Sequence, residues 1–362
     1  MKHGIVGRCT EGWFRYQAWP TVARDKNGIL YTVCSGHRLA HVCPFGKNLM
    51  YISEDHGESW SSPVIVNDSY LDDRDAGILT WGESDMMLTW FNNEEEIFDL
   101  LPWRSANIDS PLSLGMREMW KGLEPDTEYI PGAWCKFSHD NGKTWSEPRR
   151  SPVSAPHGAI RLKDGRILYV GIARFWPGFE EDSIHAFSTT DEGKTWQHES
   201  AVPILTEWKD LRLEGACEPH CVELPNGDIL VGIRNREVRP DTKDIQRISM
   251  ARSKDGGKTW EEPWVLDDMI GSPPHFCLRK DGALILSYGR RREPFGEYVR
   301  ISYDNGYTWT EDIMIRSAPD WDLGYPASVE LEDGGMLTVY YQKHGDDPYN
   351  SILYTKWDMP DR

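Results

Sequence analysis

Residues 138–145 read SHDNGKTW, and this stretch decides the fold because four other stretches repeat its pattern. The copies share Ser/Thr-x-Asp-x-Gly-x-Ser/Thr-Trp and occupy residues 53–60, 138–145, 189–196, 253–260 and 302–309. In such a unit the aspartate accepts hydrogen bonds from the following backbone N–H groups, the glycine takes a positive φ, and the tryptophan packs under the turn. No bidentate glutamate follows at the offset of a calcium loop. Each copy is therefore predicted to connect two strands of a hairpin and not to be a catalytic site.

A second repeat interleaves with the first and predicts more hairpins. Six segments place a polar turn, often Asp-Gly or Asn-Gly, between two runs of alternating apolar residues. They begin at Trp19, Asp75, Pro156, Glu218, Pro273 and Tyr325. A hairpin, a third strand, an Asp-containing turn and a fourth strand make one unit, so six units predict an all-β, six-bladed β-propeller. The sixth unit lacks an Asp-containing turn, and residues 2–9 (KHGIVGRC) are predicted to supply its fourth strand and close the ring.

Only one stretch interrupts this rhythm. Residues of about 92–132 form an acidic insertion in the second blade, with a helix expected around residues 112–123. Such an insertion is either a loop over one end of the propeller that carries specificity or a solvated decoration. No linker divides the chain, so residues 1–362 are predicted to form a single domain.

Composition and charge exclude several classes of protein. The chain has 362 residues, of which 39% are hydrophobic, enough for a sizeable core. The formal charge of -18 opposes attraction to a phosphate backbone, so nucleic acid is not expected as a partner. No apolar run is long enough for a membrane helix or a signal peptide, and no membrane association is expected. The expected location is the cytoplasm, although a secreted protein trimmed of its leader would read the same; the oligomeric state is left open.

The seven cysteines favour a reduced compartment, because an odd number cannot all pair and none form C-x-x-C. The one metal-like cluster is CEPHC at residues 217–221. On a regular strand Cys217 and Cys221 would share a face and His220 would point the other way. No metal site is therefore expected, and the cysteines are interpreted as small buried hydrophobes.

The repeat alignment assigns one equivalent position to each blade. The first residue of each hairpin begins the innermost strand of its blade, so Asp75, Glu218 and Tyr325 are predicted to face the central axis. Toward the end of the second strand stand Arg234 and Arg291, with Arg38 slightly later in the first blade. His157, His220 and His275 fall near the inner strands as further wall residues. The centre is thus predicted to gather two carboxylates, a tyrosine and several arginines.

At these residues the sequence resembles the sialidase (neuraminidase) superfamily of Asp-box, or BNR-repeat, proteins over essentially the whole chain. Residues 218–234 (EPHCVELPNGDILVGIR) resemble the segment with the glutamate that activates the nucleophile and an arginine that binds the substrate carboxylate, which implies those roles for Glu218 and Arg234. Residues 323–341 (LGYPASVELEDGGMLTVYY) resemble the segment with the nucleophilic tyrosine, which implies that role for Tyr325.

Two further segments extend the resemblance. Residues 288–296 (YGRRREPFG) sit where the last arginine of the carboxylate-binding triad belongs, and strand alternation favours Arg291 over Arg290. Residues 72–79 (DDRDAGIL) resemble the superfamily's Arg-x-x-Asp-Pro strand, which places Asp75 in the pocket with Arg74 beside it.

The resemblance implies an exo-acting glycoside hydrolase for an α-linked sialic acid or a related carboxylate-bearing sugar, with a sialylated glycan as its partner. The anomeric carbon of sialic acid carries a carboxylate that would repel an anionic nucleophile, whereas a neutral phenol avoids this repulsion. A tyrosine needs a base within hydrogen-bond reach, here Glu218, and arginines bind the substrate carboxylate. This chemistry needs no cofactor and no metal.

Two departures from the superfamily pattern leave alternatives open. In QAWP (residues 17–20) Ala18 takes the place of the first triad arginine, and Arg15 or Arg38 are the candidates to replace it. The loop SGHRLAHVCPFGKN (residues 35–48) contains no carboxylate where the superfamily has its acid/base aspartate, so Asp75, His41 or Cys43 would have to serve. The alternatives are a glycosidase for a different acidic or neutral sugar and a carbohydrate-binding propeller without turnover.

Overall fold

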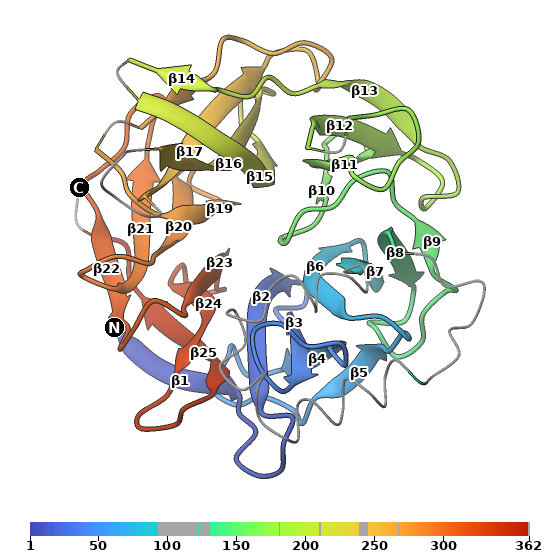
Figure 1. Ribbon diagram of the computed structural model, residues 1–362, viewed down its shortest axis with the longest axis vertical. Coiled ribbons are helices and arrows are strands. Elements are labelled where there is room, and N and C mark those ends of the chain that lie inside the picture. Colours follow the sequence, from blue (N-terminus) through green and yellow to red (C-terminus); the bar gives the residue numbers. More distant parts are fainter. Residues whose placement is uncertain are drawn as a thin grey trace.

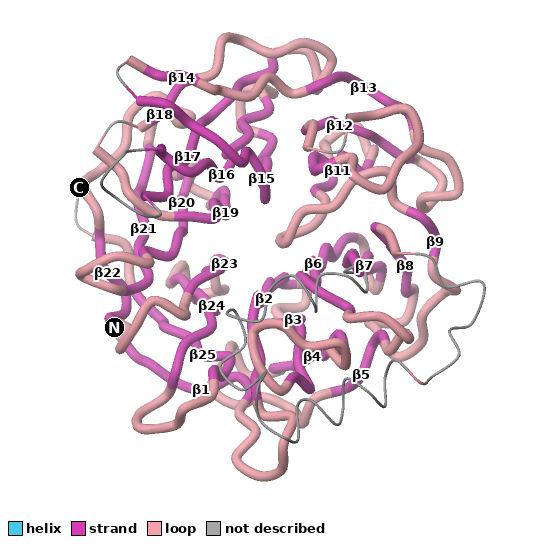
Figure 2. The backbone as a smooth tube through the Cα atoms, in the orientation of Figure 1, coloured by secondary structure: helices cyan, strands magenta, loops and turns pink. Residues whose placement is uncertain are grey.

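The computed structural model describes residues 1–92, 122, 131–180, 182–209, 211–238, 245–266 and 268–360. The predicted insertion at about 92–132 and the helix within it lie almost wholly outside these residues. In the described part of the chain the regular structure consists of strands (Figure 2). No helix among these residues is both long and apolar enough to cross a lipid bilayer.

The strands form six sheets arranged around a central axis, which confirms the six-bladed β-propeller (Figure 1). Blade one contains β2 (Tyr16–Arg24), β3 (Leu30–Arg38), β4 (Lys47–Ser53) and β5 (Val64–Asn67). Blade two contains β6 (Asp73–Trp81), β7 (Asp85–Asn92), β8 (Ala133–Ser138) and β9 (Arg149–Arg150). Blade three contains β10 (Ile160–Arg161), β11 (Ile167–Ile172), β12 (Ile184–Thr189) and β13 (Gln197–Ala201).

The remaining blades complete the circle. Blade four contains β14 (Glu207–Trp208), β15 (Leu211–Glu223), β16 (Ile229–Val238), β17 (Ile245–Ser253) and β18 (Trp264–Val265). Blade five contains β19 (Ser272–Leu278), β20 (Leu284–Arg290), β21 (Gly296–Ser302) and β22 (Ile313–Ser317). Blade six contains β23 (Gly324–Glu330), β24 (Met336–Lys343), β25 (Asn350–Trp357) and β1 (Lys2–Gly7).

The ring closes where the two ends of the chain share blade six. Strand β1 pairs antiparallel with β25, from Lys2 opposite Lys356 to Gly7 opposite Ile352 (Figure 1). The predicted closure by the N-terminal segment is therefore confirmed. The N-terminal strand is thus hydrogen-bonded into blade six as its outermost strand, and the chain then continues into blade one.

Two blades differ from the expected plan, blade four in its number of strands and blade three in the start of its inner strand. In blade four β15 and β16 run on together beyond the other strands, and the short β14 pairs with this extension at Glu207 and Arg212. In blade three the inner strand begins only at Ile160, because the chain turns at Gly158, whose N–H donates to the Ala155 carbonyl. The sequence pattern had placed the start of this strand at Pro156.

The five repeats form the predicted turns, as Asp140 illustrates. Its Oδ1 accepts hydrogen bonds from the Thr144 N–H at 2.8 Å and from Ser138 Oγ at 2.8 Å, and its Oδ2 accepts one from Thr144 Oγ1 at 2.6 Å. These hydrogen bonds, that of the Thr144 side chain first, lower the pKa of Asp140 to about 2. Gly142 takes a φ of 77°, and Trp145 packs against the apolar core between blades one and two. The turn thus fixes the outer strands against the neighbouring blade.

The hydrophobic core is divided among the interfaces between blades. In the described residues one apolar cluster fills each of the six interfaces, for example Val33 and Ile78 between blades one and two. The cluster between blades six and one also includes Trp19 and Tyr325, from the inner strands of these two blades.

The inner strands are irregular at the positions that face the axis. In five blades the register between the first and second strands shifts at this level, as at Arg74/Gly77 in blade two and Gly324/Ala327 in blade six. Trp19, Asp75, Glu218 and Tyr325 adopt φ values of 54°, 51°, 48° and 53° at these bulges. A left-handed backbone costs a non-glycine residue roughly 1–2 kcal/mol, and a bulge redirects the side chain that it carries.

Candidate active site

A cavity of about 630 Å³ lies on the axis, at the ends where the inner strands begin. Its charged lining residues are Arg74, Asp75, Arg174, Glu218, Arg234, Arg236 and Arg291. Among the described residues, five arginines thus face two carboxylates. Arg174 and Arg236 pair at 3.1 Å with Asp182 and Glu214 outside the lining. The lining itself still has a positive excess, although the whole chain is acidic, and this favours an anionic ligand.

Tyr325 and Glu218 meet in this cavity. The Tyr325 hydroxyl donates to Glu218 Oε1 at 2.6 Å, and Arg234 Nη1 donates to Glu218 Oε2 at 2.7 Å. Arg234 Nη1 also lies 3.4 Å from the Tyr325 oxygen, so one cation contacts both groups. The arrangement joins a phenol, a proton acceptor and a guanidinium within hydrogen-bond distance.

The ionisation of these groups follows from their surroundings. Burial, and then the charge of Glu218, raises the pKa of Tyr325 well above its ordinary value, so the phenol is neutral. Burial also acts to raise the pKa of Glu218, but Arg234 and the hydrogen bond from Tyr325 together hold this pKa below its ordinary value. Glu218 is therefore an anion at neutral pH and can accept the phenolic proton.

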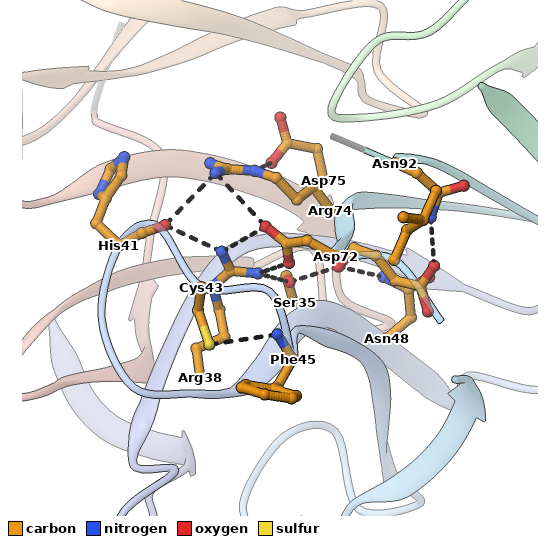
Figure 3. A network of polar contacts seen from close by, with 12 residues as sticks. Ser35, Arg38, His41, Cys43, Phe45, Asn48, Asp72, Arg74, Asp75 and Asn92 are labelled. Carbon is orange, nitrogen blue, oxygen red and sulfur yellow. Dashed lines mark hydrogen bonds and ion pairs between the residues drawn. The ribbon is translucent and has the colours of Figure 1, made fainter. Parts of the chain in front are cut away.

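Asp75 faces the same cavity from β6. Its side chain is almost entirely buried, and its Oδ1 accepts no hydrogen bond from the described residues, although Arg74 Nε lies 3.9 Å away (Figure 3). Burial raises the pKa of Asp75 to about 7, against the opposing charge of Arg74. A carboxyl group that is half protonated at neutral pH can both donate and accept a proton.

Arg38 is placed differently from the sequence prediction. It is completely buried and is not among the residues that line the cavity. Its guanidinium binds both carboxylate oxygens of Asp72, and its Nη2 also donates to the His41 carbonyl at 3.0 Å (Figure 3). The ring of Trp19 contacts both Arg38 and Arg74, whose Cζ atoms are 4.8 Å and 3.9 Å from its centroid. Arg38 is therefore a buried ion-pair partner, and Arg74 is the arginine of this layer that lines the cavity.

His41 lines the cavity and is held by blade six. Its Nδ1 lies 3.2 Å from Asp322 Oδ1 and 3.0 Å from the Tyr16 hydroxyl. Burial lowers the pKa of His41 to about 4 despite the neighbouring carboxylate, so the ring is neutral near pH 7. If Nδ1 carries the proton toward Asp322, Nε2 is left with a free electron pair.

Arg291 lies just after β20 and is the member of the arginine run that lines the cavity. Its Nε donates to the Leu323 carbonyl at 2.9 Å and its Nη2 to the Tyr341 hydroxyl at 2.7 Å. The neighbouring Arg290 instead lies 3.9 Å from Asp312. Arg291 is thus oriented by main chain and phenol, which leaves its charge without a carboxylate partner among the described residues.

Sequence reasoning missed Asp322 and Tyr341. Tyr341 could have been found, because it follows Tyr325 by the same sixteen residues that separate Arg234 from Glu218. Asp322 stands in a loop before β23, and no periodic pattern marks it. Its hydrogen bonds to Tyr16, His41 and Tyr341 appear only once blades one and six meet.

The structure also shows where the residues lie that bear on the two departures from the superfamily pattern. Ala18 is fully buried in the apolar cluster between blades six and one. Arg15 pairs with Asp347 at 2.9 Å, outside the cavity. Cys43 is buried with its Sγ near the N–H groups of Leu39 and Phe45, and burial raises its pKa (Figure 3). None of these three lines the cavity.

The expectation for CEPHC needs a correction in its geometry. The bulge at Glu218 breaks the alternation along β15. Cys217 consequently lines the central cavity, whereas Cys221 packs in the core between blades three and four. The two thiols do not share a face.

Comparison with known proteins adds a family and several relatives. The family model described as a BNR repeat-like domain matches residues 119–339. A curated sialidase of Bacteroides fragilis (strain YCH46) is 22% identical over 252 residues, which cover 62% of this chain and 42% of that protein. The match therefore spans less than half the length of this relative.

Solved structures share the fold. A Dyadobacter fermentans protein of unknown function superimposes with a TM-score of 0.76 at 21% identity and covers 99% of this chain and 98% of its own. The NanB sialidase of Streptococcus pneumoniae superimposes with a TM-score of 0.69 at 14% identity and covers 98% of this chain and 70% of its own. At such identities the likeness concerns the fold.

Proposed function

The chain belongs to the BNR repeat-like family of the sialidase superfamily, and we propose that it is a glycoside hydrolase that removes a terminal, α-linked sialic acid or a related carboxylate-bearing sugar. The observation that carries the proposal is the 2.6 Å contact between the Tyr325 hydroxyl and Glu218 Oε1 in a cavity with an excess of arginines. Nucleophilic attack at a carbon that carries a carboxylate requires a neutral nucleophile such as a phenol, a base that accepts its proton, and positive charge nearby.

The proposed reaction has two steps. In the first, Tyr325 Oη forms a bond to the anomeric carbon and passes its proton to Glu218, while Asp75 protonates the departing glycosidic oxygen. In the second, Asp75 takes a proton from water, the hydroxide attacks the anomeric carbon, and the tyrosyl bond breaks as Glu218 returns the proton. Two displacements give net retention of configuration.

The arginines have separate tasks in this proposal. Arg291 and Arg74 bind the substrate carboxylate through their guanidinium groups. Arg74 thereby substitutes for the superfamily arginine whose position Ala18 occupies in this chain. Arg234 contacts both Glu218 and Tyr325, so it stabilises negative charge as the proton moves between them. Neutral His41 forms a wall beside them.

The test is hydrolysis of three classes of aryl glycoside: α-sialosides, uronides and neutral glycosides. We expect release of the aryl group from the sialoside with retention of configuration. Incubation with a fluorinated sialyl donor should leave a covalent adduct on Tyr325, detectable by peptide mass spectrometry. Turnover of the uronide alone would favour the second candidate below, turnover of the neutral glycoside alone would reject an acidic substrate, and sugar binding with no turnover of any class would reject the enzyme.

A second candidate is a glycosidase for another acidic sugar. Ala18 favours this candidate. It stands, fully buried, where the superfamily has one of the arginines that bind the carboxylate of sialic acid, so this chain lacks that arginine. The same three substrate classes distinguish the two candidates.

A further inference from the structure

A second cavity, of about 410 Å³, lies further along the axis. The inner strands of blades two, four and six line the catalytic cavity at Asp75, Glu218 and Tyr325 and then run toward their hairpin turns. The second cavity is lined by residues beyond the first positions of the inner strands, such as Thr21 after Trp19 and His220 after Glu218. It therefore occupies the opposite end of the axis and is not part of the site described above.

Three histidines from neighbouring blades form the inner end of this second cavity. His220 and His275 stack with ring centroids 4.5 Å apart and planes 14° apart. His157 meets them edge-on at 5.7 Å and 4.9 Å. All three are at least nine-tenths buried and line the cavity, and burial lowers the pKa of each, so the rings are neutral.

The hydrogen bonds of the rings fix where their protons lie. His220 Nδ1 accepts from the Phe276 N–H at 2.9 Å, and His275 Nδ1 accepts from the Ser328 N–H at 3.3 Å. A neutral ring that accepts at Nδ1 carries its proton on Nε2, so both are N–H donors at the ring end away from the backbone. The Thr21 hydroxyl donates to the Pro156 carbonyl at 3.2 Å and lies 3.2 Å from His157 Nδ1, so Nδ1 of His157 donates to Thr21 and its buried Nε2 carries no proton.

This pattern is opposite to that of a metal site. A histidine that binds a metal normally donates its other N–H to a carboxylate or carbonyl group. Here the other nitrogen of His220 and of His275 accepts a hydrogen bond, so Nε2 is not free to coordinate a cation. In the part of the chain that the structure describes, no group of three or more histidine, cysteine or acidic side chains could hold a metal ion.

The charged residues that line the second cavity are mostly cationic. They are Arg24, Arg161, Lys163 and Glu223, a positive excess in a chain whose formal charge is -18. Lys163 Nζ donates to the Leu224 carbonyl at 2.8 Å, and this neutral acceptor does not cancel the charge of the lysine. Arg24 Nε is buried without a hydrogen-bond partner among the described residues, and its Nη2 is 3.9 Å from the exposed Glu332.

We propose that this second cavity binds a small oxyanion of the phosphate or sulfate class, independently of the catalytic cavity. His220 and His275, which carry their protons on Nε2, line this cavity together with Arg24 and Arg161. Guanidinium and imidazole N–H groups are strong donors to oxyanions, and an excess of positive charge draws such ligands in. The bound ion would link the inner strands of blades one, three, four and five.

Thermal unfolding in the presence of inorganic phosphate tests this proposal. We expect phosphate to raise the melting temperature in a saturable way, beyond the effect of sodium chloride at equal ionic strength, because a ligand that binds the native state stabilises it. Isothermal titration gives the dissociation constant. Arg161→Gln alters an exposed side chain and should fold normally, and it should weaken phosphate binding by about tenfold, as should Arg24→Gln.

The control is Arg234→Gln, because the catalytic cavity also contains arginines that attract phosphate. In this variant the saturable rise in melting temperature should persist. A rise that is lost in Arg234→Gln but kept in Arg161→Gln would assign the ion to the catalytic cavity and overturn the proposal. Equal shifts with phosphate and chloride would also overturn it.

Discussion

The hydroxyl of Tyr325 donates a hydrogen bond of 2.6 Å to Glu218, 107 residues earlier in the chain. Tyr325 lies near the start of β23 and Glu218 at the bulge within β15, and both adopt a left-handed backbone, with φ values of 53° and 48°. Such a backbone costs each residue roughly 1–2 kcal/mol, and it persists because the surrounding bulge and strand pairings hold it. The pseudo-symmetry of the propeller therefore explains how two distant residues come to share one proton.

Tyr325→Phe should reduce turnover by at least about a thousandfold, because the variant lacks the attacking oxygen. The loss of one hydrogen bond should cost about 1 kcal/mol of folding stability. Steady-state kinetics with the best aryl glycoside, together with denaturant unfolding, measure both effects. Tyr340→Phe is the matched control, since its buried hydroxyl contacts Thr355 at 2.8 Å, away from the cavity. If the two variants lose the same small amount of activity, Tyr325 is not the nucleophile.

The dependence of kcat/KM on pH should follow two carboxyl groups. Glu218, whose pKa Arg234 and Tyr325 hold below its ordinary value, must be ionised, so the acid limb should lie at lower pH than the titration of an ordinary glutamate. Asp75, whose pKa is raised to about 7, must be protonated for the first step, so activity should decline above about pH 7. A profile measured from about pH 3 to 9 that stays flat across pH 7 would exclude Asp75 as the acid.

Asp75→Asn should slow hydrolysis in proportion to the need for leaving-group protonation. An alkyl or sugar aglycone should be released about 10²–10⁴-fold more slowly, whereas a nitrophenyl leaving group should be affected much less. Comparing the two substrates at one pH gives the ratio directly. Equal losses on both substrates would assign Asp75 to binding and leave His41 as the remaining candidate from that region.

The same variant should be more stable than the wild type at high pH. The raised pKa means that the native state binds the Asp75 proton more tightly than the unfolded chain does, so this stabilising contribution is present below about pH 4 and is lost as the pH rises through about 7. The amide side chain of the variant cannot ionise, so the variant does not lose this contribution. Melting temperatures of the two proteins should therefore agree near about pH 4 and diverge at about pH 8, and the opposite order would show that Asp75 is not buried as a costly charge.

The sequence predicts the fold well because each turn repeat is a local signal that needs no distant partner. The five aspartate turns, the six hairpins and the closing strand follow from spacing and residue type alone. The same alignment leads to Asp75, Glu218 and Tyr325, because equivalent residues of a pseudo-symmetric ring meet at its axis. What repeats in the sequence also repeats in space.

Contacts between blades lie beyond this kind of inference. Arg38 matches the expected position for a cavity arginine, yet Asp72, which precedes the inner strand of the next blade, binds two of its nitrogens and turns it into a buried pair. Asp322 reaches His41 from the other side of the ring closure. The bulges are equally hidden, because a residue such as Glu218 carries no sign of a left-handed backbone in its type.

The buried pair of Arg38 and Asp72 gives the last prediction. Arg38→Met removes the cation that binds both oxygens of the fully buried Asp72 carboxylate, whose contact with Arg74 is longer at 3.9 Å, so it should lower the free energy of unfolding by about 3–5 kcal/mol. The double variant Arg38→Met with Asp72→Asn removes both charges and should regain at least half of that loss. Arg74→Met, which alters the neighbouring arginine on the cavity side of Trp19, should raise KM with a smaller change in stability. Urea unfolding and kinetics of the three variants separate these roles. An Arg38→Met protein with wild-type stability and a raised KM would show that Arg38 binds substrate. A large loss of stability in Arg38→Met and a raised KM in Arg74→Met would instead show that the Arg38–Asp72 pair supports Trp19 and Arg74 from below the cavity.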